Sequence, residues 1–296
     1  MAFSTKLLRM QLELFKPFVN GCTLEVARSG QDKLGQLMAR THQSEVEYEE
    51  AVFPCFSGEW IRPRQRRRRG VILYLHGGGY VAGDISYARG YGTILCAKNG
   101  MDVFCAAYRL APEAPYPAAL EDAQQAYQYL LDSGYMPQEI LFCGESAGGG
   151  LIYALALQLR DQGKPLPACL IAISPWVDLT LSGKSYEENR QRDPSLTKER
   201  LAFFVQQYLR EGETAENPLV SPLFADLVGM PPSLIFVGSD EILLDDARRL
   251  ARKLSEAGCR VQLQVREDMW HAYLLYGVRE ARQDDEQIQA FIEEVL

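Results

Sequence analysis

The stretch EILFCGESAGGGLIYALALQL (residues 139–159) joins a strand-like sequence to a helix-like sequence through a tight turn. Apolar residues run up to Cys143, and an alanine- and leucine-rich segment with helical spacing follows the glycines. Between them stands Ser146, whose neighbours Gly144, Ala147 and Gly148 are all small. A sharp strand-to-helix turn requires small neighbours and projects a serine hydroxyl from the end of the sheet. The stretch therefore predicts a nucleophilic serine in an α/β fold.

Short β-branched segments alternate with helical patterns over most of the remaining chain. Alternation of this kind is typical of a mostly parallel central sheet that is flanked by helices. Residues 45–56 instead alternate polar and apolar side chains, which predicts a half-exposed antiparallel edge strand. The parallel strands are expected at residues 71–75, 102–108, 139–144, 168–174, 233–238 and 260–265, and helices at 119–131, 149–160 and 243–257.

Two segments lie outside this alternation. In residues 1–45, the side chains of Leu8, Leu12, Phe15 and Val19 fall on one helical face. Residues 178–222 are polar and contain a helical patch between two sheet strands. Segments of this size beside a sheet are either surface additions or a cap over a site, and the pattern alone leaves both open.

Composition limits the function classes. The chain has 296 residues, of which 47% are hydrophobic and 24% charged, with a formal net charge of −8. This charge argues against nucleic acid as a partner, and against an anionic membrane. No apolar run of 18 residues is present, so no membrane span is expected, and the charged N-terminal segment does not resemble a signal peptide. We expect a cytoplasmic protein.

Metal-ligating residues are few and dispersed. The chain has seven cysteines without a CxxC pair and three histidines, so no metal site is predicted. The arginine-rich residues 62–69 are interpreted as a solvated loop, with nucleic-acid binding or anion docking as the weaker alternative.

The sequence HGGGY (residues 76–80) follows the strand expected at 71–75. Consecutive glycines allow the main chain to approach a ligand closely and to direct N–H groups at it. Such donors stabilise the negative charge that develops on a carbonyl oxygen under nucleophilic attack. We therefore assign the oxyanion hole to the N–H groups of Gly78, Gly79 and Ala147. His76 is expected to orient the loop.

A serine hydroxyl needs a base, and the base needs a carboxylate that orients it. His42 precedes the sheet, whereas His271 follows the last expected strand, so we assign His271 as the base. Asp240 comes directly after the strand at 233–238 and is the predicted acid, with Asp245 as the alternative. Tyr80 is a candidate substrate-binding residue that could equally pack under the loop. Glu145 is either a supporting acid or a residue that the turn tolerates.

Several motifs together resemble a known family. HGGGY, YRLAPEAPYPAALEDA (108–123), GESAGGG, SPWVDL (174–179), SDEILLDDA and WHAY resemble the microbial hormone-sensitive-lipase-like (family IV) carboxylesterases of the α/β-hydrolase fold. The resemblance implies a catalytic domain at 46–296 and a small helical cap made by residues 1–45 and an insertion at about 178–222. It also implies hydrolysis of small acyl esters without a cofactor or a metal.

These observations predict a serine carboxylesterase for short acyl chains, from acetyl to hexanoyl, that uses Ser146, His271 and Asp240. The substrate is expected to be a small-molecule ester. A lipase for longer acyl chains, or an inactive ligand-binding protein of the same fold, are the alternatives. The strand at 260–265 alternates apolar and polar residues and could pair with a second subunit, so a homodimer is possible.

Overall fold

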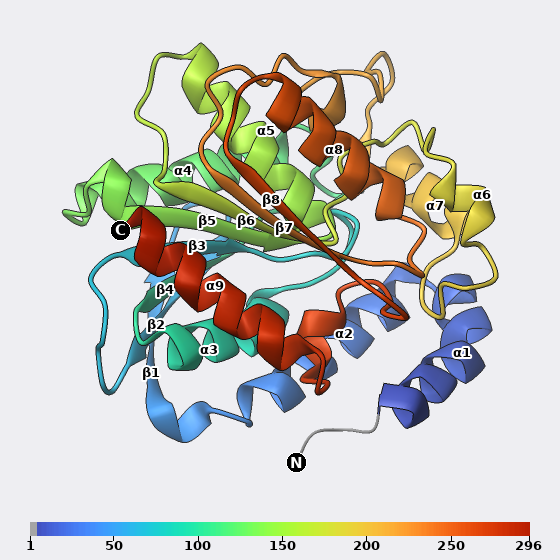
Figure 1. Cartoon of the computed structure of the whole chain (residues 1–296), viewed down its shortest axis with the longest axis horizontal. Coiled ribbons are helices and arrows are strands. Elements are labelled where there is room, and N and C mark those ends of the chain that lie inside the picture. Colours follow the sequence, from blue (N-terminus) through green and yellow to red (C-terminus); the bar gives the residue numbers. More distant parts are fainter. Residues whose placement is uncertain (1–4) are drawn as a thin grey trace.

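An eight-stranded mixed sheet forms the centre of the molecule in the computed structural model, which describes residues 5–296 (Figure 1). The strand order is β1-β2-β4-β3-β5-β6-β7-β8. The first two pairings, β1 with β2 and β2 with β4, are antiparallel, and the other five are parallel. The strands are β1 (Val46–Val52), β2 (Ser57–Pro63), β3 (Val71–Leu75), β4 (Asp102–Ala107), β5 (Ile140–Glu145), β6 (Cys169–Ile173), β7 (Ser233–Gly238) and β8 (Val261–Arg266).

The predicted α/β fold is confirmed, including all six parallel strands and the antiparallel edge strand. Strand β2 is missing from the prediction, in which its last two residues, Arg62 and Pro63, belong to the arginine-rich segment interpreted as a loop. Its residues Trp60 and Ile61 are nevertheless buried, so the strand is held by packing against the sheet.

Helices cover both faces of the sheet (Figure 1). The helices α4, α5 and α8 pack on one face, whose core includes Leu120, Ile152 and Leu250. Helices α3 and α9 pack on the other face, whose core includes Tyr91 and Ile292. Their bounds are α3 (Ile85–Asn99), α4 (Ala118–Asp132), α5 (Ala147–Asp161), α8 (Leu244–Glu256) and α9 (Ala281–Val295).

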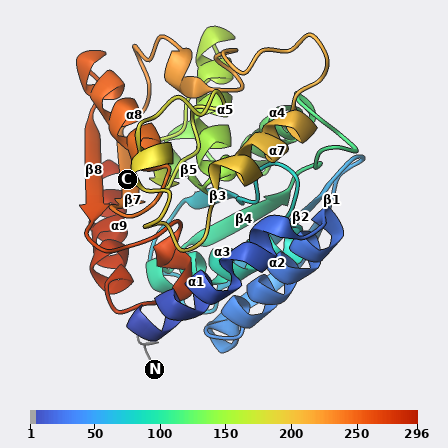
Figure 2. The same ribbon diagram turned by 90° about the vertical axis from the view of Figure 1, so that its right-hand side faces the viewer.

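The N-terminal helices α1 (Thr5–Gly21) and α2 (Leu24–Ala39) lie against this core on the side shown in Figure 2. Helix α2 approaches α3 very closely, since a Cβ atom on Gly35 would lie 2.3 Å from the carbonyl oxygen of Ser86. Thr23 caps α2 by accepting a hydrogen bond from the N–H group of Val26. The close contact fixes α2 beside the first turn of α3.

The segment 178–222 contains the short helix α6 (Ser185–Glu188) and the longer helix α7 (Lys198–Tyr208). Thr197 caps α7 by accepting from the N–H group of Arg200. In Figure 2, α7 lies across the molecule above α1 and α2. Two segments far apart in sequence thus approach the same end of the sheet. Residues 1–4 of the expected N-terminal cap segment lie outside the described residues.

The arginines of residues 62–69 form ion pairs and hydrogen bonds within the chain. Arg62 and Arg66 bind the carboxylate of Asp102, which is fully buried at the start of β4. Arg67 donates to the carbonyl oxygens of Ala97 and Lys98. The remaining pairs are Arg64 with Glu47, Arg68 with Glu293 and Arg69 with Glu139. The segment therefore fastens the edge of the sheet to its neighbours.

Strand β8 is the last strand of the sheet, and its residues are half-buried. Whether this edge pairs with a second subunit stays a prediction. In the described part of the chain, no helix has the length and apolar character needed to cross a bilayer.

Candidate active site

Ser146 lies at the junction of β5 and α5 in a strained backbone conformation, with φ 54° and ψ −121°. Positive φ is uncommon for residues other than glycine and marks a position that the surroundings enforce. The turn is tight because a Cβ atom on Gly148 would lie 2.0 Å from the carbonyl oxygen of Leu75. The strand–turn–helix context predicted from the sequence is present, and Ser146 lines a cavity.

His271 lines the same cavity, in the turn that follows β8. Its Nδ1 atom is 3.0 Å from Oε2 of Glu241. The other carboxylate oxygen of Glu241 accepts from the hydroxyl of Ser174 at 2.8 Å and from the N–H group of Gly238. Because Nδ1 faces Glu241, Nε2 is the nitrogen that remains for proton exchange with Ser146.

Ser174 also accepts a hydrogen bond of 3.0 Å from the N–H group of Ala272, the residue after His271. One hydroxyl therefore connects the acid to the turn that carries the base. Ser174 opens the motif SPWVDL, which is the sequence signal for this residue, but the motif alone assigns it no role.

The pKa of His271 is raised above its usual value of 6.5. Burial alone would lower this pKa, but the hydrogen bond and the negative charge of Glu241 raise it by more. Glu241 is fully buried, so its carboxylate acts on the imidazole through a medium of low polarity. The pair is arranged to stabilise a protonated imidazole.

Ser146 and His271 share the cavity without a direct hydrogen bond between their side chains, within the residues that the structure describes. Hydrogen bonds between a nucleophile and its base are often long before substrate binds and shorten in the reacting complex. The positions are therefore compatible with proton transfer once a substrate is in place.

The glycine loop that follows β3 lies beside the serine. A Cβ atom on Gly77 would be 3.0 Å from Cβ of Ser146, and Gly78 and Gly79 both line the cavity. Within residues 5–296, the N–H groups of Gly78, Gly79 and Ala147 donate to no other group of the chain. They remain available as hydrogen-bond donors to a substrate oxygen.

His76 supports the glycine loop from the side of the protein core. It is fully buried, its ring stacks on Tyr108 at 4.3 Å between centroids, and its Nδ1 atom is 2.7 Å from the carbonyl oxygen of Gly77. Burial lowers its pKa to about 4, so the ring is neutral at physiological pH. These contacts agree with the orienting role expected for His76.

Comparisons with known proteins agree with this geometry. Residues 72–275 match the family described as alpha/beta hydrolase fold. An acetyl-hydrolase of Streptomyces hygroscopicus is 41% identical over 220 residues, which cover 74% of this chain and 73% of that protein. An esterase of Acinetobacter venetianus is 38% identical over 207 residues, covering 70% and 68% of the two chains.

A solved structure, described as an esterase from the bacterial hormone-sensitive lipase family, is 36% identical and covers 100% of this chain, with a TM-score of 0.89. The comparison covers 99% of that protein. This chain belongs to the hormone-sensitive-lipase-like esterases. Another structure, described as a hormone-sensitive lipase from a metagenome library, has a TM-score of 0.91 at 33% identity and covers 99% of this chain and 98% of that one. The recognised family is therefore confirmed.

Among the described residues, the structure does not bring Asp240, the predicted acid of this esterase, into contact with His271. The side chain of Asp240 forms ion pairs with Arg9, at 2.8 Å, and with Arg192. Asp240 and Glu241 follow β7 directly, and the two neighbouring side chains project in different directions. Asp245, the alternative, accepts from the N–H group of Ser185. Glu241 is the acid that contacts the histidine.

Of the two interpretations of Tyr80, the structure favours packing under the loop over substrate binding. Its ring is 2% exposed and stacks on Tyr208, with 3.9 Å between the centroids. Tyr80 is not one of the described residues that line the cavity. The backbone of Tyr80 has a positive φ of 62°. Tyr80 therefore supports the glycine loop from the core.

Glu145, the residue before Ser146, connects the serine turn of the esterase site to the glycine loop that follows β3. Its carboxylate accepts from the N–H group of Gly77 at 2.6 Å and from the hydroxyl of Tyr74 at 2.5 Å. Burial raises the pKa of Glu145 to about 7, and the hydrogen bonds only partly oppose this effect. The residue before the nucleophile thus holds the loop that carries the expected oxyanion donors.

Replacing Glu145 with glutamine is expected to change how stability depends on pH. In the folded wild type, the pKa of this group is about 7, against 4.5 for the free side chain. The folded state therefore binds more protons between these values, and the wild type loses stability as pH rises through this window. Glu145→Gln lacks the effect. In urea unfolding from pH 4 to pH 8, the free energy of unfolding of the wild type should fall relative to Glu145→Gln. A constant difference would contradict the raised pKa.

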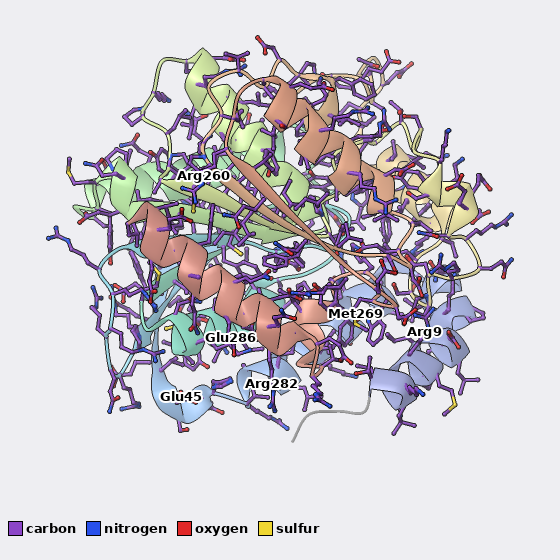
Figure 3. The ribbon with its side chains drawn as sticks, in the orientation of Figure 1. Arg9, Glu45, Arg260, Met269, Arg282 and Glu286 are labelled. Atoms are coloured by element: carbon purple, nitrogen blue, oxygen red, sulfur yellow. The ribbon has the colours of Figure 1, made fainter. Side chains whose placement is uncertain are left out.

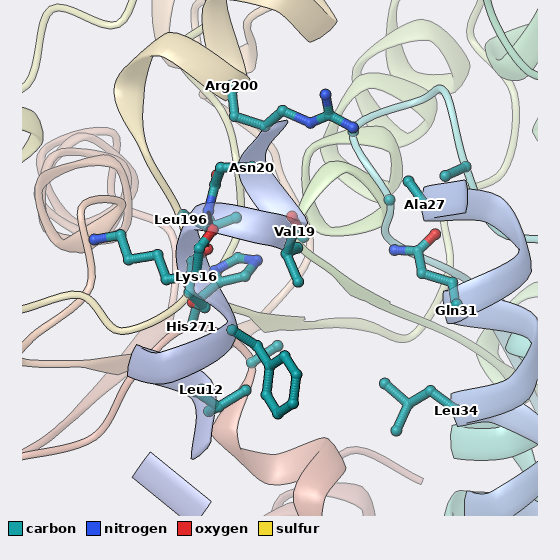
Figure 4. Close-up of a pocket in the computed structure, with 18 of the residues that line it drawn as sticks. Leu12, Lys16, Val19, Asn20, Ala27, Gln31, Leu34, Leu196, Arg200 and His271 are labelled. Atoms are coloured by element: carbon teal, nitrogen blue, oxygen red, sulfur yellow. Dashed lines mark hydrogen bonds between the residues drawn. The ribbon is translucent and has the colours of Figure 1, made fainter. Parts of the chain in front are cut away.

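The cavity has a volume of about 490 Å³ and is lined mainly by apolar side chains. Helices α1 and α2 form part of its wall, and Figure 4 shows Leu12 and Val19 opposite Gln31 and Leu34, with His271 nearby. Leu196, Arg200 and Phe204, from the segment 178–222, complete this side. Both segments outside the α/β alternation border the cavity. Their assignment as a cap domain stays a prediction.

Proposed function

We propose that this esterase hydrolyses short-chain acyl esters, from acetyl to hexanoyl, through Ser146, His271 and Glu241. The observation that carries the proposal is the contact of Glu241 with Nδ1 of His271, in a cavity that also contains the strained serine. A carboxylate in this position fixes the imidazole tautomer and stabilises the imidazolium that forms during attack.

The reaction proceeds in two halves. His271 takes the proton of Ser146 as Oγ attacks the ester carbonyl, and the N–H groups of Gly78, Gly79 and Ala147 stabilise the oxyanion. Each such donor contributes about 3 kcal/mol to transition-state stabilisation. His271 then protonates the leaving alcohol as the tetrahedral intermediate collapses to an acyl-enzyme. Water, deprotonated by the same histidine, attacks the acyl group and releases the acid and the free serine.

The size of the cavity supports short acyl chains. About 490 Å³ must hold both the acyl and the alcohol part of the ester. The names of similar proteins point the same way: one is an acetyl-hydrolase, and another structure comes from a crystal soaked with p-nitrophenyl butyrate. The apolar lining favours hydrocarbon chains over charged acyl groups.

Hydrolysis of p-nitrophenyl esters from C2 to C16, at one fixed detergent concentration, tests the proposal. We expect kcat/KM to be highest between C2 and C6 and to fall by about tenfold or more at C12, because a chain that protrudes from the cavity adds no further burial. Ser146→Ala provides the background rate at each length. A maximum at C10 or above would favour a lipase, and no rate above that of Ser146→Ala would contradict the esterase assignment for these substrates.

A further inference from the structure

Helix α1 presents a row of apolar side chains to solvent. Leu7, Met10, Leu14 and Phe18 are 50%, 59%, 75% and 64% exposed, respectively. Their spacing places them on one side of the helix. The face predicted from the sequence is a different one, with Leu8 and Leu12 packed against the core. A surface helix normally turns its apolar side to the protein, so this outer row needs another explanation.

The polar side of α1 holds the helix in this orientation. Arg9 donates to the carbonyl oxygen of Asp268 at 3.0 Å, and Figure 3 shows Arg9 on the side of the loop that carries Met269. Lys16 donates to the carbonyl oxygen of Asp193 at 2.5 Å, and Asn20 to that of Ser195 at 2.9 Å. The helix cannot rotate to bury the outer row without breaking these hydrogen bonds.

The outer row continues into the entrance of the cavity. Phe15, Phe18 and Val19 line the cavity and are 57%, 64% and 52% exposed. They therefore border both the solvent and the space in front of Ser146. Any surface that binds the outer row would therefore lie directly in front of the cavity entrance.

We propose that the outer row, Leu7, Met10, Leu14 and Phe18, docks this enzyme on the uncharged surface of a water-insoluble ester phase. The proposal rests on the proposed function, because the docked surface supplies the substrate. The row carries no charge, while the chain has a net charge of −8, which disfavours anionic lipid and favours a neutral surface. A second copy of the chain seated on the row would instead cover the side chains that border the entrance.

The test uses tributyrin droplets and two matched double variants in an inactive Ser146→Ala background. Met10→Gln with Leu14→Gln changes two side chains of the outer row that do not line the cavity. Val52→Gln with Val228→Gln changes two apolar side chains elsewhere, which are 81% and 58% exposed. We expect the first pair to weaken flotation with the droplets by about tenfold or more and the second pair to leave it unchanged.

The same pairs are then made with Ser146 intact. Hydrolysis of dissolved p-nitrophenyl acetate is expected to stay within about twofold for both pairs, because neither alters the cavity. Equal droplet binding by the two pairs would overturn the proposal. So would a dimer in sedimentation that Met10→Gln with Leu14→Gln dissociates, since the row would then bind a second copy. If only the esterase assignment were wrong, the Ser146→Ala protein would still bind the droplets, because flotation does not depend on hydrolysis.

Discussion

Replacing Glu241 with glutamine is expected to lower kcat by about 10³- to 10⁴-fold while the fold is retained. Glutamine keeps the size of the side chain but removes the negative charge opposite Nδ1 of His271. It can also present an N–H group to Nδ1, which favours the wrong tautomer of the imidazole. Single-turnover and steady-state hydrolysis of p-nitrophenyl butyrate would measure the loss, with thermal unfolding as a check on folding.

The pH dependence gives the same variant a second signature. His271 must be neutral to accept the serine proton, so activity is present above its pKa and is lost as pH falls through it. Burial lowers the pKa of His271, but Glu241 raises it by more, so that the pKa lies above 6.5. The acid limb of the wild-type profile is therefore expected above pH 6.5, and in Glu241→Gln it should move to lower pH.

The neighbouring residue provides the matched control. Asp240→Asn makes the same kind of change one position earlier, at a carboxylate that pairs with Arg9 and Arg192. We expect it to keep kcat within about tenfold and to leave the acid limb in place, because this side chain does not contact the histidine. A large loss of kcat in Asp240→Asn, with near-normal turnover in Glu241→Gln, would restore the assignment made from the sequence.

Replacing Gly78 with alanine is expected to lower kcat by about 10²- to 10³-fold, the effect of misplacing one oxyanion donor. The backbone of Gly78 has φ +110°, and a Cβ atom there would lie 2.1 Å from the carbonyl oxygen of Ala82. The loop must shift to accept the methyl group, and its N–H groups shift with it. Because these donors act mainly on the transition state, KM should change much less than kcat.

The variant Gly134→Ala is the control that separates the misplacement of oxyanion donors from simple backbone strain. Gly134 also has a positive φ, +92°, but a Cβ atom there would have no neighbour within 4 Å. Alanine at this position is expected to cost about 1 kcal/mol of stability and to leave kcat unchanged. If both variants lost activity equally, general destabilisation would explain the result and the assignment of Gly78 to the oxyanion hole would be contradicted.

The sequence predicts the sheet and the serine turn well because both depend on local patterns. Apolar strands of five to seven residues, separated by helical spacing, identify the six parallel strands. The strained turn at Ser146 depends on small neighbours that can be read directly, and the same is true of the loop that contains Gly78.

The sequence alone could not place the side chains near His271 or settle the position of Tyr80, because both depend on side-chain direction. Asp240 and Glu241 both follow β7 directly, and nothing in the sequence says which of them faces the turn after β8. The direction is set by Arg9 and Arg192, which come from distant segments and bind Asp240. Likewise, Tyr80 turns into the core because Tyr208 of α7 offers it a stacking partner. Tertiary contacts decide both cases.

The bond between Glu145 and the N–H group of Gly77 has a consequence for the timing of catalysis. It joins the residue before Ser146 to the loop that contains Gly78, so the proposed nucleophile and the proposed oxyanion donors are linked at the end of the sheet. Stabilisation by fixed donors is most effective when no reorganisation is needed during the reaction. The serine and the loop that carries the proposed oxyanion donors are therefore held together before an ester arrives, and only the contact between Ser146 and His271 has still to form.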